Sequence, residues 1–114
     1  MEDRIYILKK SNVKNKRYSL INETTNEKYD FGHKEYDNYT IHKDEDRKRA
    51  YLKRSKNLNN NNELNNNTLA RMILWNKPTI RRSIKDVEKK FNIIIKKKIW
   101  LLYIWKKILN NKIS

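Results

Sequence analysis

The sequence predicts a small α+β protein, and three observations lead to this prediction. The first third of the chain holds short β-prone runs, at Ile5 and Ile7, at residues 17–21 and at residues 28–31. The later segments show the charge order and apolar spacing of helices. A chain of 114 residues has room for one core and a tail, but not for two full cores. We therefore expect a short N-terminal β-hairpin followed by three to four helices, the last two of which form an αα-hairpin.

The hairpin is expected to pair residues 17–21 with residues 28–31. Residues 22–26 between these runs are rich in Asn and Thr, which tolerate turns. Gly32 follows the second run, at a position where glycine adopts a positive φ angle most easily.

A charged helix is expected within residues 36–56. Acidic residues at 44–46 stand at its start and basic residues at 53, 54 and 56 stand at its end, which is the order that the helix dipole favours. Thr40 or His42 is expected to cap its first turn.

Eight of the eleven residues from Asn57 to Asn67 are Asn, a composition that predicts a flexible linker. Two helices are expected after it, at residues 68–75 and 79–92, with Pro78 in the first turn of the second. The second helix has an apolar face, formed by Ile80, Ile84, Val87 and Phe91. The chain thus divides into residues 1–56, the linker 57–67, a helical hairpin of the same domain at 68–92, and a basic aromatic tail at 93–114.

The net charge is concentrated in one part of the chain. The whole sequence has a formal charge of +15, but residues 1–46 sum to −1 and residues 47–114 to +16. This asymmetry is typical of a protein that binds a polyanion. The absence of cysteine excludes disulfides and thiolate zinc sites, and a single glycine excludes a dinucleotide fingerprint or a P-loop. We expect no cofactor and no catalytic residues.

The predicted nucleic-acid site combines the basic residues of the charged helix with those of the last helix. Arg47, Tyr51 and Arg54 fall at i, i+4 and i+7, on one stripe of the charged helix. Arginine and lysine contact phosphates, and a tyrosine between them stacks or packs. The full set is Arg47, Lys48, Arg49, Tyr51, Lys53, Arg54, Arg81, Arg82, Lys85 and Lys89. A solvated helix face with Asp44 and Asp46 pairing its arginines is the competing interpretation.

Two other patterns suggest alternative sites. The helix, break and basic helix across residues 68–92 resemble a helix-turn-helix reader, but any αα-hairpin of a basic protein has this pattern. His33, Asp37, His42 and Asp44 lie in a dense polar patch that would suit a metal-dependent nuclease. Helix capping and surface ion pairs explain the same residues without a metal.

A docking function is predicted for four aromatic residues, Trp75, Trp100, Tyr103 and Trp105. The last three stand in a tail with too few consecutive apolar residues to span a bilayer. The tail is expected to dock on a partner protein, or to insert its aromatic side chains into a membrane interface. The N-terminal Met-Glu-Asp-Arg is polar, so we expect no secretory signal. The oligomeric state is left open.

Several motifs follow one another in a recognisable order. They are Phe31-Gly32, a D-x-Y-T-x-H-K-D block from Asp37 to Asp44, an R-K-x-x-Y-x-x-R block from Arg47 to Arg54, and L-W-N-K-P from Leu74 to Pro78. Over residues 16–92 the chain resembles a family of small, basic, uncharacterised proteins from nucleocytoplasmic large DNA viruses. It departs from that family at Ser55, where a histidine is usual, and in its uniform Asn tract, and the tail lies outside the resemblance. The resemblance implies a viral source, and the family offers no established activity to carry over.

The leading hypothesis is a non-enzymatic viral protein that binds nucleic acid through phosphate contacts, DNA rather than RNA, in the virion or in the infected cell. Six to ten such contacts would lower affinity by about 10³- to 10⁵-fold between 50 and 200 mM salt. The alternatives are a minor capsid or scaffold protein that docks through its tail, and a metal-dependent nuclease.

Overall fold

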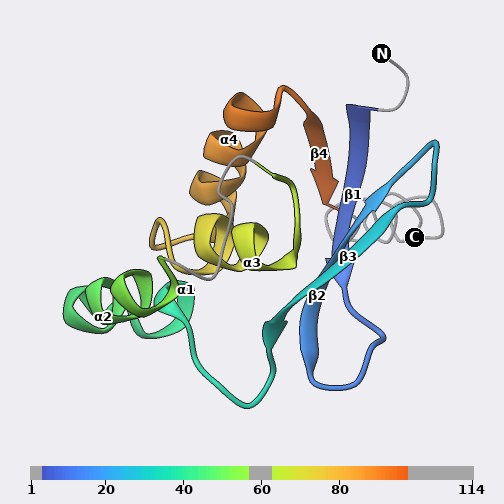
Figure 1. Ribbon diagram of the computed structural model, residues 1–114. Helices are drawn as coiled ribbons and strands as arrows, with labels where there is room; N and C mark the ends of the chain where they lie inside the picture. Colours follow the sequence, from blue (N-terminus) through green and yellow to red (C-terminus); the bar gives the residue numbers. More distant parts are fainter. Residues whose placement is uncertain (1–3, 57–62, 98–114) are drawn as a thin grey trace, which may run out of the picture.

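The computed structural model describes residues 4–56 and 63–97 and has an α+β architecture, which confirms the predicted fold class (Figure 1). This part of the chain contains four strands, four α-helices and one π-helical segment, η2. In chain order the elements are β1 (Ile5–Lys10), β2 (Lys16–Asn22), β3 (Lys28–His33), α1 (Tyr39–His42), α2 (Glu45–Ser55), α3 (Asn66–Leu69), η2 (Ala70–Leu74), α4 (Ile80–Phe91) and β4 (Ile94–Lys97).

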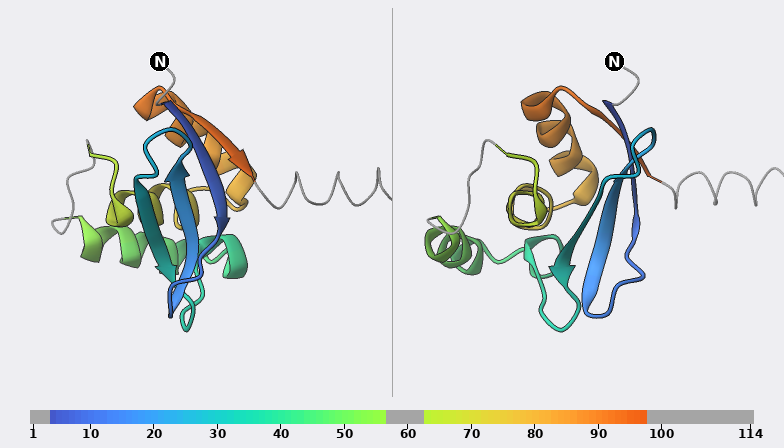
Figure 2. Two further views of the ribbon diagram at one scale, coloured as in Figure 1. Left: turned by 90° about the vertical axis from the view of Figure 1, so that its right-hand side faces the viewer. Right: turned by 45° about the vertical axis from the view of Figure 1, so that its right-hand side comes forward.

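The strands form one mixed sheet in the order β3-β2-β1-β4. The three N-terminal strands are antiparallel neighbours, and β4 pairs with β1 in parallel. Leu8 lies opposite Leu20, and Tyr18 lies opposite Phe31, so alternate residues of these strands share one face. Helices α3 and α4 cover that face, while α2 lies beyond the end of β3 (Figures 1 and 2).

The hydrophobic core lies between the sheet and these helices. Leu20 and Phe31 from the sheet, and Leu69 and Ile73 from α3 and η2, are at most 1% exposed. The apolar face predicted for the last helix is confirmed: Ile84 and Val87 are buried in this core, and Ile80 and Phe91 pack against it. The helix runs within the predicted residues 79–92.

The predicted caps of the charged helix were wrong. Asp44 is the N-cap of α2, and its carboxylate accepts hydrogen bonds from the backbone N–H groups of Asp46 and Arg47 at 2.9 and 3.1 Å. Thr40 and His42 instead belong to the separate short helix α1, which is capped by Asn38. Helix α1 ends at His42, and the φ of +54° at its C-cap residue Lys43 turns the chain before Asp44 caps the next helix.

The predicted linker and the helix after it also need correction. Asn65 caps α3 by accepting a hydrogen bond from the Thr68 N–H at 2.8 Å, so the last Asn residues of the predicted linker begin a helix. Residues 57–62 lie outside the described part of the chain. Thr79 caps α4, which places Pro78 before the cap and not in the first turn. Asparagine is a strong N-cap residue, and this explains why a polar tract can start a helix.

The start of the predicted tail is a strand. Asn92, with a φ of +53°, ends α4, and Ile94–Lys97 then forms β4 beside β1. The Glu88 carboxylate accepts a hydrogen bond from the Ile95 N–H at 2.9 Å. Ile95 is buried because it lies opposite Tyr6 on the core face of the sheet, and a β-branched residue suits such a strand. Trp100, Tyr103 and Trp105 lie outside the described residues.

Asp30 on β3 is held by two hydroxyl groups. Ser11 Oγ donates to its carboxylate at 2.7 Å, Ser19 Oγ donates to the same oxygen, and Lys28 Nζ lies 3.6 Å from the other. Burial raises the pKa of Asp30. The hydrogen bonds from Ser19 and Ser11 and the charge of Lys28 together lower it by more than burial raises it, so the pKa lies below its usual range.

We expect Asp30 to make the protein less stable in acid. A depressed pKa stabilises the folded state above the ordinary pKa of an aspartate, and this stabilisation is lost as the pH falls through the folded-state value. Asp30→Asn should therefore lower the free energy of unfolding at pH 7 by about 1–3 kcal/mol. Between pH 7 and pH 3, the free energy of unfolding should fall less in this variant than in the unaltered protein. Urea unfolding at both pH values measures this, with the exposed Glu23→Gln as control. An unchanged pH dependence in Asp30→Asn would contradict the assignment.

Candidate nucleic-acid interface

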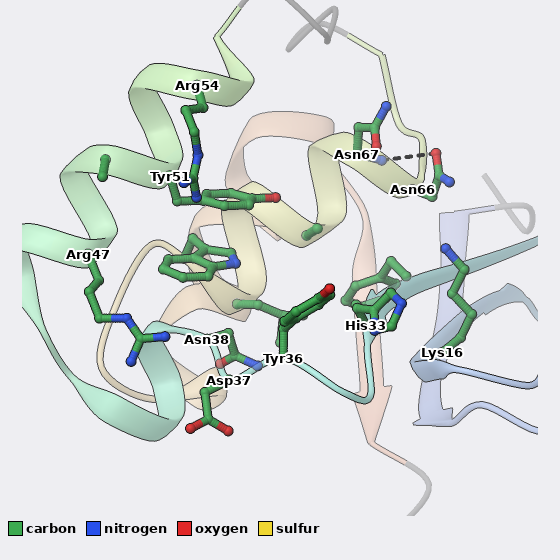
Figure 3. A pocket seen from close by; sticks show the side chains of 16 residues that line it. Lys16, His33, Tyr36, Asp37, Asn38, Arg47, Tyr51, Arg54, Asn66 and Asn67 are labelled. Carbon is green, nitrogen blue, oxygen red and sulfur yellow. Dashed lines mark hydrogen bonds between the residues drawn. The ribbon is translucent and has the colours of Figure 1, made fainter.

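One face of α2 lines a cavity of about 510 Å³. Arg47, Tyr51 and Arg54, the residues predicted to form one stripe, all border it (Figure 3). Their common orientation follows from their spacing, since i, i+4 and i+7 lie on one side of a helix. The Asp44 cap fixes where this helix begins, and so which of its residues face the cavity.

The other walls come from elements far apart in the sequence. The end of β3 and the loop after it form one wall with His33, Tyr36 and Asp37, and the start of α3 contributes Asn66 and Asn67 (Figure 3). The side chain of Lys16, at the start of β2, stands on the side opposite α2. No local pattern in the sequence indicates that these residues lie beside Arg47.

Two aromatic rings are stacked at this wall. The rings of Tyr51 and Trp75 lie 4.2 Å apart at an interplanar angle of 8°. Trp75 also packs against the core, and the His42 ring lies 5.3 Å from it. Burial raises the pKa of Tyr51, although the charges of Arg71 and Arg54 oppose this, and the hydroxyl therefore stays protonated at neutral pH. Trp75 therefore connects the Tyr51 ring of the cavity wall to the hydrophobic core.

The loop after β3 is fixed by Arg17 and Gly32. The Arg17 guanidinium donates to the backbone carbonyls of His33, Lys34 and Tyr36 at 3.1, 3.2 and 2.9 Å. Gly32 has a φ of +81°, as its position predicted, and Leu74 of η2 packs directly against it. These contacts hold the β3 wall in place opposite α2.

The cavity carries an excess of positive charge. Lys16, Arg47 and Arg54 border it, and Asp37 is the only carboxylate among the described lining residues. Within residues 4–56 and 63–97, the two ion pairs are Lys28–Asp30 and Arg49–Asp46, so neither Arg47 nor Arg54 is neutralised there. The competing interpretation, in which Asp44 and Asp46 pair with the helix arginines, is therefore correct for Arg49, which pairs with Asp46, but not for Arg47 or Arg54. Unpaired guanidinium groups beside an open cavity are suited to bind an anion.

The other predicted contact residues lie elsewhere. Lys48 Nζ donates to the Asn76 carbonyl at 2.5 Å and lies 4.7 Å from the centre of the Tyr39 ring, so it ties α2 to the loop before α4. Arg49 and Lys53 are exposed on the opposite side of α2. The α4 residues Arg81, Arg82, Lys85 and Lys89 are exposed and do not line the cavity. The predicted set is thus divided between at least two surfaces.

The four residues proposed for a metal site do not form a metal-binding group in the described part of the chain. No group of three or more His, Asp or Glu side chains that could hold a metal ion occurs in the described part of the chain. His33 Nδ1 accepts a hydrogen bond from the Glu35 N–H at 3.2 Å, and His42 Nδ1 accepts one from the Asp44 N–H at 2.9 Å. Asp44 is the helix cap. Three of the four residues thus already serve local structure.

No helix among the described residues is long and apolar enough to cross a membrane.

Comparison with known proteins finds one family model that matches part of the chain. Residues 6–55 match the model of a family of unknown function, DUF5754. The match covers less than half of the chain and extends from β1 to α2, so it includes Lys16, Arg47 and Arg54 but not Asn67 or Trp75. No curated protein and no solved structure matches the chain.

Proposed function

We propose that this chain is a non-enzymatic viral protein that binds nucleic acid, DNA in preference to RNA, through phosphate contacts made at the cavity. The observation that supports this most strongly is the position of Arg47 and Arg54, which have no carboxylate partner in the described residues and border a cavity with aromatic walls. Arginine binds phosphate oxygens through two parallel hydrogen bonds. The β2–β3 hairpin would carry the side of the cavity with Lys16 and His33. A helical hairpin of α3, η2 and α4 would carry the side with Asn66 and Asn67.

The viral origin in this proposal rests on the sequence resemblance. The motifs from Phe31 to Pro78 support a source among large DNA viruses, and the excess positive charge after residue 46 suits a protein packed beside the genome. The proposed location is the virion or the infected host cell.

The salt dependence of DNA binding tests this function. Fluorescence anisotropy with a labelled oligonucleotide gives the affinity at several salt concentrations between 50 and 200 mM. Three contacts, from Lys16, Arg47 and Arg54, predict a slope of log K against log salt of about −2 on a single strand. If the four basic residues of α4 also contact phosphates, the slope becomes about −5, which corresponds to a loss of about 10³-fold. An affinity that does not change with salt, or no binding at 50 mM, would contradict the proposal.

A second candidate function is docking on a capsid or scaffold protein. It is favoured by Ile5, Ile7, Ile21 and Ile94, which the register places on the sheet face opposite the core. No described element covers that face (Figure 2). Ile94 is 54% exposed, and an apolar patch of this kind is a frequent protein contact. A deletion that tests docking by the tail must begin at Lys98, because residues 94–97 are part of the sheet.

A further inference from the structure

The size and shape of the cavity limit which form of nucleic acid can enter it. A volume of about 510 Å³ is within the range of pockets that enclose a small ligand. A base inside a duplex is stacked and paired, and enters such a pocket only if it is flipped out at a cost. A base of a single strand is free to enter without this cost. The concave site therefore favours unpaired bases over an intact duplex.

The walls offer aromatic surface to a planar group. The Tyr36 side chain is 67% exposed, and its ring lies 4.7 Å from the His33 ring at the edge of the cavity. Tyr51 lies across from them, stacked on Trp75 (Figure 3). Nucleic-acid bases stack on such aromatic side chains without regard to sequence.

Polar groups in the same cavity can meet the edge of a base. The Tyr51 hydroxyl and the Asn67 side-chain amide form no hydrogen bond within the described part of the chain, and both border the cavity. An amide offers a donor and an acceptor, and a hydroxyl offers both as well. These groups can donate to and accept from the edge of a base, and they can also donate to a phosphate oxygen.

The cations lie on more than one side of the cavity. Arg47 and Arg54 are two turns apart on α2, a rise of about 10 Å along the helix axis, and Lys16 is on the opposite wall (Figure 3). A single phosphate group, as on a phosphopeptide, would reach one of these positions. A polynucleotide that crosses the cavity would place successive phosphates near several of them.

We propose that the cavity binds single-stranded nucleic acid, with one unstacked base against Tyr36 and the flanking phosphates on Arg47, Arg54 and Lys16. This inference rests on the proposed function and adds the form of the ligand and the residue that stacks on the base.

The experiment compares three labelled ligands of 12 nucleotides: a thymidine single strand, a duplex, and a strand of abasic sugar-phosphate units. Each is titrated with the full-length protein at one salt concentration. The single strand is expected to bind tighter than both others. Tyr36→Ala should weaken single-strand binding by about 5- to 100-fold and leave abasic binding unchanged, whereas Tyr36→Phe should bind like the unaltered protein. The Tyr36 ring is exposed and Arg17 bonds only its backbone carbonyl, so these variants retain the loop.

The possible outcomes separate this inference from the proposed function. Equal affinity for all three ligands would overturn base binding and leave phosphate binding intact. Failure of every ligand to bind would overturn both. A loss in Tyr36→Phe as large as in Tyr36→Ala would overturn stacking. A labelled phosphotyrosine peptide is titrated as a fourth ligand, and tighter binding of this peptide than of the single strand would overturn the proposal in favour of a protein partner.

Discussion

Replacing Gly32 by alanine is expected to lower the free energy of unfolding by about 2–4 kcal/mol. A Cβ atom at this position would lie 2.7 Å from Leu74 Cδ1 and 3.2 Å from Arg17 Cβ. Leu74 is 1% exposed, so it has little room to move away. The φ of +81° adds a conformational cost for any residue with a side chain. Overpacking of a core commonly costs 1–3 kcal/mol, which accounts for the remainder.

The double variant Gly32→Ala/Leu74→Ala separates the two costs. Leu74→Ala alone leaves a cavity in the core and should be destabilising by about 2–5 kcal/mol. If the clash is real, the combined loss will be smaller than the sum of the single losses, because the shorter side chain makes room for the new methyl group. Urea unfolding of the four proteins completes the cycle. A Gly32→Ala protein within about 0.5 kcal/mol of the unaltered one would contradict this account of the β3–η2 packing.

The double variant Arg47→Ala/Arg54→Ala is expected to bind DNA about 10- to 100-fold more weakly. Each substitution removes a guanidinium group with no carboxylate partner in the described residues. A loss of about 0.7–1.4 kcal/mol at each of these exposed contacts, which is less than the 1.5–3 kcal/mol typical of a hydrogen bond to a charged group, gives this range. Neither side chain is buried in the core, so the fold should be retained. Anisotropy titrations at 50 mM salt measure the loss.

The matched control is Arg49→Ala/Lys53→Ala. It also removes two positive charges from α2, but from the side opposite the cavity, where Arg49 is paired with Asp46. Its affinity should fall by no more than a few fold. Equal losses in the two double variants would show that net charge, and not the cavity, determines binding.

Local patterns in the sequence predicted the features that depend on neighbouring residues. The apolar spacing of α4 and the Arg47, Tyr51 and Arg54 stripe both follow from helical periodicity. The positive φ of Gly32 followed from its place after a β-prone run. These features need no information about distant parts of the chain.

The features that were missed depend on contacts between distant residues. β4 pairs Ile94 with Ile5, which lies at the other end of the described chain, and a run of four residues does not indicate its partner. The cavity is similar: Lys16, Tyr36 and Asn67 meet Arg47 only after the sheet and helices have packed. The Asn tract misled the prediction because Asn65 acts as a cap through its side chain, whereas composition predicts only a linker.

The salt dependence of the two double variants tests the central claim most directly. The claim is that Arg47 and Arg54 contact phosphates at the cavity. On a single strand, the slope of log K against log salt should become less negative by about 1.4 in Arg47→Ala/Arg54→Ala, because two contacts are lost. The slope of Arg49→Ala/Lys53→Ala should match that of the unaltered protein. Identical slopes for all three proteins would contradict the claim.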